Sequence, residues 1–304
     1  MEGSKTFSWR VAITWLLGLL ICGGLIWGGP LAKPAIADVP LSVAVNSNVE
    51  HPEAVDLEAA DPEATDPEAA DLEATDLEAI DLETENSVYS YRDRPSSDGI
   101  GKVYLGREIA KVMGYEGAGW LERGGRESQE KPSAAIASLN LRPDDVVVDI
   151  GAGTGYFSTR IAPKVPEGQV LAVDVQPEMV DILGWMKNEY QLSNLQPVLG
   201  NETDPHLPEG GVDVVIMVDV YHELAYPNEM MRKVVRALRP DGRVVVLEYR
   251  AENPFVLIKR LHKMSLRQLQ KEMQTVGLKL AESPKILPQQ HYAIFTFDKD
   301  AVEG

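Results

Sequence analysis

A glycine-rich turn with an acid on each side is the feature of this chain best suited to bind a nucleotide-like ligand. The apolar, β-branched run 146–150 contains Asp149 and leads directly into glycines at 151, 153 and 155. A second apolar run has Asp174 near its end, nineteen residues after Gly155. An acid about 20 residues beyond such a turn is placed to bind a ribose. The pattern predicts a buried parallel strand that delivers a ligand to the start of a helix.

The spacing of the glycines separates two classes of cofactor. A dinucleotide fingerprint needs a glycine at position 156, where this chain has Tyr156. The spacing is instead G-x-G-x-G, preceded by an acid. In this form residues 130–297 resemble the class I S-adenosylmethionine-dependent methyltransferases, with a domain of the methyltransferase type 11/25 kind. The resemblance implies S-adenosyl-L-methionine as the cofactor.

The first two strand ends supply most of the expected cofactor site. The resemblance implies that Asp149 holds the methionyl ammonium, directly or through water. Asp174 would accept both ribose hydroxyls, a task suited to a carboxylate. Gly151, Gly153 and Gly155 form the turn, and at the first two a Cβ would block close approach of the ligand to the backbone. The helix that follows would present its free N–H groups to the ligand's carboxylate.

Later strand ends complete the expected cofactor site. The resemblance implies that Asn201, after the third short strand, meets the adenine amine; a plain turn is the alternative. Met179 either packs on the adenine or belongs to the helical core. Asp219, at the end of the fourth strand, would border the methionine and the transferred methyl.

His222 and Glu223 follow the fourth strand and are the candidate catalytic residues. Imidazole titrates near neutral pH, so His222 could take a proton from an OH or NH acceptor. Glu223 could orient the ring or act alone. The alternative is a structural His222 that packs the loop. No metal ligands are expected, because the histidines show no paired spacing on a common element.

Segments outside these strand ends are expected to meet the methyl acceptor. They are 248–250, at the end of the fifth strand, and 259–265, which contains His262. Tyr104, Trp120 and Arg123 could form a lid over the cofactor, although Trp120 also suits a hydrophobic plug.

Three functions are compatible with these residues. The first is methyl transfer to a small-molecule or lipid-like, membrane-associated acceptor. The second is a non-catalytic S-adenosylmethionine-binding module on a membrane tether. The third is an NAD-dependent oxidoreductase, which Tyr156 and the lack of a Tyr-x-x-x-Lys pair near a helix disfavour.

The elements that must position these residues alternate between strand and helix. Strands are expected at 145–150, 169–175, 195–199, 212–219, 243–248 and 291–297, and helices at 104–113, 132–139, 155–163, 177–190, 228–238 and 265–276. Such alternation predicts an α/β fold with a doubly wound, parallel sheet. The resemblance adds a Rossmann-like seven-stranded sheet, an antiparallel last strand and an N-terminal helical cap.

Charge along the chain is strongly uneven. The formal net charge is −18, but residues 34–91 contain sixteen acids and no Lys or Arg, which leaves −2 for the rest. No basic excess remains to hold a phosphate backbone, so nucleic acid is not an expected partner.

The composition divides the chain into four parts. Residues 1–37 are expected to be a signal peptide or membrane anchor, with the uncharged run 11–29 in the membrane if it is not cleaved. Residues 38–95 form an acidic pentapeptide repeat, expected to be a disordered linker. Residues 96–140 would be the helical cap, and 141–298 the methyltransferase domain. The N-terminal segment predicts export or membrane anchoring, whereas the cytosolic source of the cofactor favours the cytosolic face.

Overall fold

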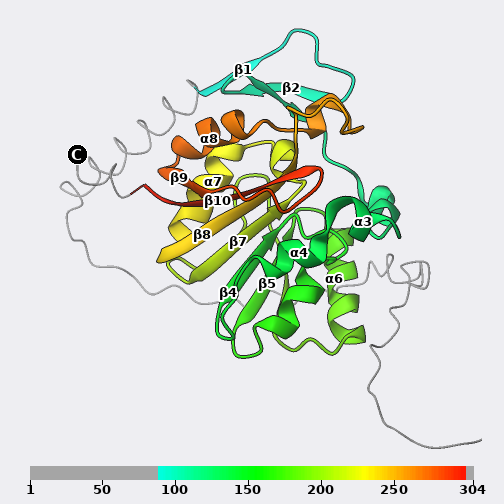
Figure 1. Ribbon diagram of the computed structural model, residues 1–304, viewed down its shortest axis with the longest axis vertical. Helices are drawn as coiled ribbons and strands as arrows, with labels where there is room; N and C mark the ends of the chain where they lie inside the picture. The colour runs from blue at the N-terminus through cyan, green and yellow to red at the C-terminus, as the bar shows by residue number, and fades with distance from the viewer. Residues whose placement is uncertain (1–87, 299–304) are drawn as a thin grey trace, which may run out of the picture. The chain divides into compact units, whose positions relative to one another are not determined.

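The computed structural model describes residues 88–298, which contain a seven-stranded and a three-stranded sheet (Figure 1). The large sheet has the strand order β6-β5-β4-β7-β8-β10-β9. Its strands are β4 Val146–Ile150, β5 Gln169–Asp174, β6 Leu195–Leu199, β7 Val212–Val218, β8 Leu238–Tyr249, β9 Leu278–Glu282 and β10 Gln290–Phe297. The strands β4 to β8 pair in parallel, and β10 runs antiparallel to β8 and β9. The predicted Rossmann-like sheet with an antiparallel last strand is confirmed.

Helices cover both faces of the large sheet. The α-helices within residues 88–298 are α2 Ala118–Leu121, α3 Arg126–Glu130, α4 Pro132–Ala137, α5 Ser158–Ile161, α6 Pro177–Glu189, α7 Pro227–Ala237 and α8 Leu266–Gln274. The helices α4, α5 and α6 contribute to one apolar core cluster, and α7 and α8 to the other. The strands between them are buried on both faces because residues such as Val147 and Val148 pack into opposite clusters.

Local sequence explains where several helices begin and end. The helices α4, α6 and α7 begin with proline, whose fixed φ suits the first helical position. Helix α8 begins after Ser265, whose side chain accepts a hydrogen bond from the Gln268 N–H at 3.1 Å. It ends before Gly277, at φ +78°.

The small sheet corrects the prediction of a purely helical cap. Strands β1 Tyr89–Tyr91, β2 Gly99–Tyr104 and β3 Arg107–Ala110 form an antiparallel sheet where a helix was expected over 104–113. Leu105 and Gly106 both have positive φ, at 50° and 95°, which makes the tight turn of a hairpin. The short helices α2, α3 and α4 lie in the rest of the segment 96–140.

The boundary of the acidic linker is also corrected. Residues 88–95 were assigned to the linker, but β1 pairs with β2, and Tyr89 packs on Tyr104 with ring centroids 5.2 Å apart. The predicted segment 1–37 and the rest of the linker lie outside the described residues. Among residues 88–298, no helix combines the length and apolar character needed to cross a membrane.

The small sheet packs on α8. Tyr104 Oη and Thr275 Oγ1 are 2.8 Å apart, and the Arg107 guanidinium forms a buried ion pair with Glu272, with Nε 2.8 Å from Oε1. In Figure 1 the cyan strands β1 and β2 accordingly lie next to the orange helix α8. The N-terminal segment is thus tied to an element that follows it by more than 160 residues.

Candidate active site

A cavity of about 540 Å³ lies beyond the carboxyl ends of β4, β5 and β7. Gly151 and Gly153 line it from the turn after β4, Asp174 from the end of β5, and Asp219 from just after β7. Ligands of open parallel sheets bind at this edge. The fold thus brings together the strand ends that the sequence singled out.

The glycine turn has the backbone conformation that its composition predicts. Gly151, Gly153 and Gly155 have φ of +68°, +55° and +82°, values that favour glycine. A Cβ on Gly151 would lie 2.3 Å from Val220 Cγ2, and one on Gly153 would lie 2.8 Å from Leu121 Cδ1. Gly155 does not line the cavity; a Cβ there would meet the core residue Leu183.

Asp149 lies behind the glycine turn and does not line the cavity. Its carboxylate accepts a hydrogen bond from Ser158 Oγ at 2.6 Å, at the start of α5. Burial raises the pKa of Asp149 to about 6, against the opposing effect of Ser158. The side chain is thus placed to support the turn rather than to touch a ligand directly.

Asp174 lines the cavity and is 6% exposed. Its carboxylate accepts backbone hydrogen bonds from Gly153 at 2.9 Å and from Gln176 at 3.0 Å. Burial raises its pKa, and the backbone donors oppose the shift. Asp174 therefore links the glycine turn to the loop after β5, in the position expected of a ribose ligand.

Asn201 forms a turn and does not line the cavity. Its Oδ1 accepts from the backbone of Thr203 and Asp204, at 2.9 and 2.8 Å. The alternative reading of Asn201 as a turn residue is therefore the one that the structure favours. Its neighbour Glu202 lines the cavity instead, and so does the buried Met179 of α6.

Asp219 has an unusual backbone and a buried carboxyl group. Its φ is +50°, and its N–H donates to Leu247 O at 2.9 Å. Oδ2 accepts from Gln290 Nε2 at 2.7 Å, whereas Oδ1 is buried without a hydrogen-bond partner. Burial and the nearby Glu248 and Glu130 carboxylates raise the pKa of Asp219 to about 8.

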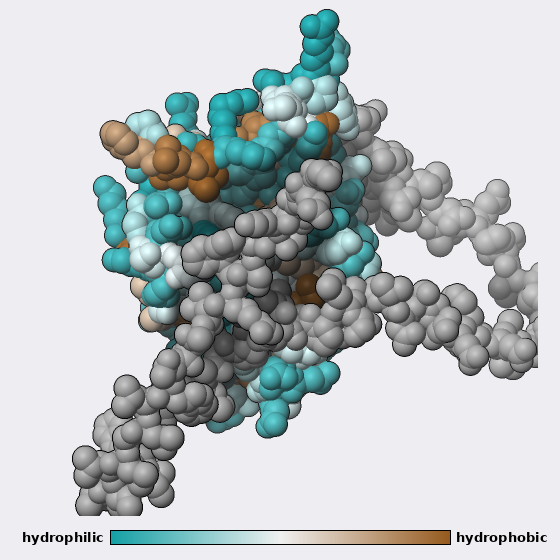
Figure 2. Space-filling model, turned by 90° about the vertical axis from the view of Figure 1, so that its right-hand side faces the viewer, coloured by the Kyte–Doolittle hydropathy of each residue, from teal (hydrophilic) through white to brown (hydrophobic). Residues whose placement is uncertain are grey.

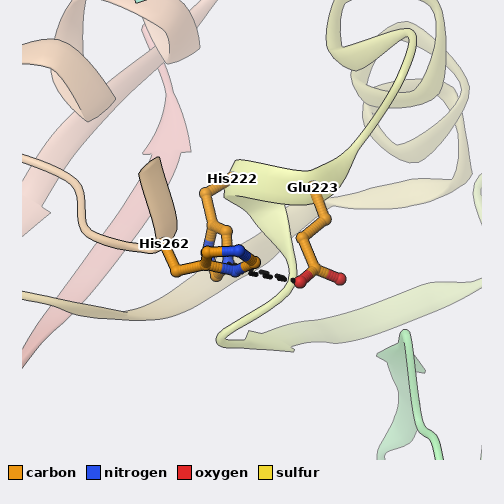
Figure 3. Close-up of side chains that lie close together, drawn as sticks. All are labelled: His222, Glu223 and His262. Atoms are coloured by element: carbon orange, nitrogen blue, oxygen red, sulfur yellow. Dashed lines mark hydrogen bonds and ion pairs between the residues drawn. The ribbon is translucent and has the colours of Figure 1, made fainter. Parts of the chain in front are cut away.

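His222 and Glu223 line the cavity and meet a third residue there, His262. They lie on the turn Tyr221–Glu223, labelled η5, and His262 ends the turn Arg260–His262, labelled η6. His222 Nε2 is 3.0 Å from His262 Nδ1, although the two residues are 40 positions apart. Figure 3 shows the three side chains directed toward one another. The cluster could not be predicted from spacing along the sequence, because its two histidines lie on different turns, η5 and η6.

The charges around His222 do not suit the predicted general base. Burial lowers the pKa of His222, but the Glu248 and Glu223 carboxylates outweigh it and raise the pKa to about 10. Without a cation bound beside it, a ring with this pKa is protonated at neutral pH and has no free lone pair with which to accept a proton. Burial raises the pKa of Glu223, but hydrogen bonds from His222 and His262 lower it to about 2.

Sequence reasoning missed a buried cation at the cavity wall. Arg126, on α3, is 5% exposed and lines the cavity. Its Nε donates to Glu130 at 2.8 Å, and its guanidinium lies over the Tyr156 ring at 4.3 Å from the centroid. Of the expected lid residues, Trp120 lines the cavity and Arg123 stacks on the Trp120 ring. Tyr104 packs against α8 instead. No spacing rule connects Arg126 to the glycine turn, because tertiary packing brings them together.

The comparisons with known proteins agree with this fold. Residues 148–244 match the family model described as "Methyltransferase domain". The chain is 28% identical over 137 residues to an uncharacterised methyltransferase-like protein of Schizosaccharomyces pombe, covering 45% of this chain and 51% of that protein. It is 32% identical over 125 residues to a demethylmenaquinone methyltransferase of Symbiobacterium thermophilum, covering 40% and 48%. The chain spans about half the length of these curated relatives.

A solved structure shows the same fold. A SAM-dependent methyltransferase from Aquifex aeolicus superimposes with a TM-score of 0.56 at 21% identity, covering 60% of this chain and 99% of that one. The family model and this fold together support the predicted class I S-adenosylmethionine-dependent methyltransferase. S-adenosylmethionine is the cofactor of this family, and the predicted family and cofactor are confirmed.

Proposed function

We propose that this protein transfers the methyl group of S-adenosylmethionine to a small, largely apolar acceptor bound in the same cavity. The observation that carries the proposal is the shared cavity itself. One side is lined by Asp174 and the glycine turn, and the other by a separate polar cluster, His222, Glu223 and His262. A protein that only bound the cofactor would not need a second polar wall.

The residues present fit the cofactor. At the glycine turn, a Cβ on Gly153 would crowd Leu121, so the close approach there depends on glycine. Asp219 Oδ1 is buried without a partner, and an ammonium group beside it would supply the missing hydrogen bond and favour the ionised carboxylate against its raised pKa. Asp174 would hold the ribose, Asp219 the methionyl ammonium, and Arg126 the carboxylate. The cofactor supplies an electrophilic methyl group on a sulfonium, which is already a good leaving group.

The chain's own residues would mainly position the acceptor. In-line transfer needs the acceptor atom at about 3 Å from the methyl carbon, so exclusion of other orientations supplies much of the rate enhancement. Trp120, Met113 and Leu257 line the cavity and offer apolar surface for this.

The cavity mouth supports an apolar acceptor. Leu257, which lines the cavity, is 94% exposed, and Phe255 beside it is 88% exposed. Figure 2 shows a mostly hydrophilic face with a few apolar groups gathered on its upper part. The relative from Symbiobacterium thermophilum bears the name of an enzyme that methylates a quinone, which is an acceptor of this chemical kind.

Cofactor binding and turnover test the proposal separately. Calorimetry should show one S-adenosylmethionine bound per chain. Incubation with a panel of phenols, quinols and hydroxylated lipids should then release S-adenosylhomocysteine with at least one acceptor. Binding without turnover across the panel would instead favour a non-catalytic module, and absence of binding would reject both.

A further inference from the structure

Three donor atoms converge on one wall of the cavity. They are Nε2 of His222, Oε1 of Glu223 and Nδ1 of His262 (Figure 3). The two nitrogens are 3.0 Å apart, and the Glu223 oxygen is 3.6 Å from His222 Nε2 and 3.1 Å from His262 Nδ1. The three atoms therefore form a compact triangle with sides of 3.0–3.6 Å.

The size of this triangle matches the coordination shell of a transition-metal ion. Metal bonds to imidazole and carboxylate are about 2.0–2.2 Å long. Donor atoms are then about 3.0 Å apart in an octahedral arrangement and about 3.4 Å apart in a tetrahedral one. The observed separations need only small adjustments to either arrangement.

Hydrogen bonds to the atoms that face away from the cluster orient two of the three ligands, His222 and Glu223. His222 Nδ1 is 2.7 Å from Oε2 of the fully buried Glu248, so the other ring nitrogen faces the cluster. Glu223 Oε2 accepts a hydrogen bond from the Met113 N–H at 3.2 Å, which leaves Oε1 to face the cluster. A carboxylate behind a ligating histidine is the usual way in which proteins orient a metal ligand.

The third ligand also has a carboxylate behind it. His262 Nε2 lies 2.8 Å from Asp98 Oδ2, a contact of opposite charges that is not aligned as a hydrogen bond. With neutral rings oriented by these carboxylates, Nε2 of His222 and Nδ1 of His262 would face each other with lone pairs. Such an arrangement is unfavourable unless a positive charge lies between them. The carboxylates of Glu223, Glu248 and Asp98 surround the position, although Asp98 also pairs with Lys259 Nζ at 2.7 Å and Arg107 donates to the His222 carbonyl at 3.0 Å.

We propose that His222, Glu223 and His262 bind a divalent first-row transition-metal ion such as Zn²⁺. Two imidazoles and one carboxylate on one side of the ion form the set used by catalytic zinc and non-haem iron sites, which keep positions open for a substrate. Because all three ligands line the cavity, the open positions face its interior. The role of the ion in catalysis rests on the proposed methyl transfer. The acceptor would then bind the ion through a hydroxyl or enol oxygen, and the ion would lower the pKa of that O–H group.

Metal binding by the full-length chain tests the proposal. After removal of metals with a chelator, the protein should bind one Zn²⁺ per chain in calorimetry, and Co²⁺ should give visible absorption bands of a site with nitrogen ligands. His262→Ala should weaken Zn²⁺ binding at least 100-fold. The exposed His206, which contacts Leu199 O outside the cavity, provides the control: His206→Ala should bind as the wild type does. Any Zn²⁺ bound by the acidic segment 38–95 is the same in the wild type, His262→Ala and His206→Ala, so it does not affect the comparison.

Two further variants separate ligation from folding. Glu223→Gln keeps the side-chain volume and should also weaken Zn²⁺ binding at least 100-fold. Glu248→Gln should weaken it by about 10–100-fold, as expected for a positioning residue. Circular dichroism identifies any variant that has lost its fold. Equal affinities in wild type and His262→Ala, or no stoichiometric binding of Zn²⁺ or Co²⁺, would overturn the proposal in favour of a network held by protons alone.

Measurement of both metal binding and S-adenosylmethionine binding on the same samples distinguishes a failure of the metal site from a failure of the proposed methyl transfer. S-adenosylmethionine binding without metal binding rejects only the metal site. Metal binding that depends on His262, without cofactor binding, supports the metal site and rejects methyl transfer.

Discussion

Asp174 is the single side chain whose loss should most directly weaken cofactor binding. It lines the cavity and accepts backbone hydrogen bonds from Gly153 and Gln176. Asp174→Ala would remove charge-assisted hydrogen bonds to the ribose, each contributing roughly 1.5–3 kcal/mol. We expect at least a ~100-fold loss of S-adenosylmethionine affinity in calorimetry. Asp181→Ala, on the exposed face of α6, is the matched control and should bind normally.

Asp149 should make stability depend on pH in an unusual direction for an acid. Its pKa is raised to about 6 by burial, so between about pH 4 and 6 the folded state binds more protons than the unfolded state. Its contribution to the free energy of unfolding therefore falls as pH rises through this window. Asp149→Asn removes the titration.

Denaturant unfolding of Asp149→Asn and wild type at several pH values tests this expectation. The difference in unfolding free energy, variant minus wild type, should increase from pH 4 to pH 7, by up to roughly 3 kcal/mol. A difference that stays constant over this range would show that Asp149 does not titrate there.

At the residue scale, the sequence indicated the cofactor side of the cavity better than the opposite side. Gly151, Gly153 and Asp174 follow strands in a fixed order, so local spacing reveals them. The grouping of His222 with His262 depends on two turns that only the fold brings together. The structure places the Asn201 side chain in a local turn outside the cavity, an arrangement that spacing along the sequence cannot distinguish from a ligand contact.

At the scale of elements, five of the six predicted strands agree with the structure to within about one residue, since burial leaves a continuous apolar run. Strand β8 is the exception: it begins at Leu238 rather than at 243, because the charged and turn-forming residues 239–243 concealed its start. The small sheet was not predicted, because the turn at Leu105 and Gly106 lies inside a run whose apolar residues also fit helical spacing. Strand β9 was missed because Leu278–Glu282 is only partly buried and mixes apolar with charged residues.

Gly184, inside α6, and Gly168, just before β5, provide two stability predictions of opposite sign. Gly184 lies inside α6, and a Cβ there would meet nothing within 4 Å. Gly184→Ala should raise the unfolding free energy by about 0.5–1 kcal/mol, since alanine loses less conformational freedom in a helix. Gly168 precedes β5, where a Cβ would lie 2.0 Å from Asp145 O. Gly168→Ala should lower the unfolding free energy by roughly 1–3 kcal/mol.

Denaturant unfolding with both variants measures these changes directly. Stabilisation by Gly168→Ala, or destabilisation of more than ~1 kcal/mol by Gly184→Ala, would contradict the packing described around the two positions.

At the scale of the whole molecule, the contacts of Tyr89 predict how far the chain can be shortened before the described domain loses stability. Tyr89 donates to the Glu229 carboxylate, accepts from the Asn228 N–H at 3.1 Å and lies in β1. A chain shortened to begin at residue 86 keeps these contacts, so it should melt as the full chain does and keep its cofactor affinity. A chain that begins at residue 92 loses β1 and should be less stable by roughly 2–4 kcal/mol.

Thermal melts of the three lengths give the measurement. The loss expected for the shortest chain corresponds to about 4–16 °C in a domain of this size. Equal melting temperatures for the chains that begin at 86 and 92 would show that β1 does not contribute to stability.

The positions of His262, Glu248, Met113 and Arg126 in the chain have a consequence for how this site can diversify. All four lie outside residues 148–244, the part that matches the methyltransferase family, whereas the glycine turn and Asp174 lie inside it. The matched segment therefore holds the glycine turn and Asp174, whereas the flanking segments add Arg126 to the proposed donor site and His262, Glu248 and Met113 to the cluster around His222. Related chains can keep the glycine turn and Asp174 while substitutions in the flanking segments change the residues that face the acceptor. Similarity within the matched segment alone is therefore a poor guide to which acceptor each chain modifies.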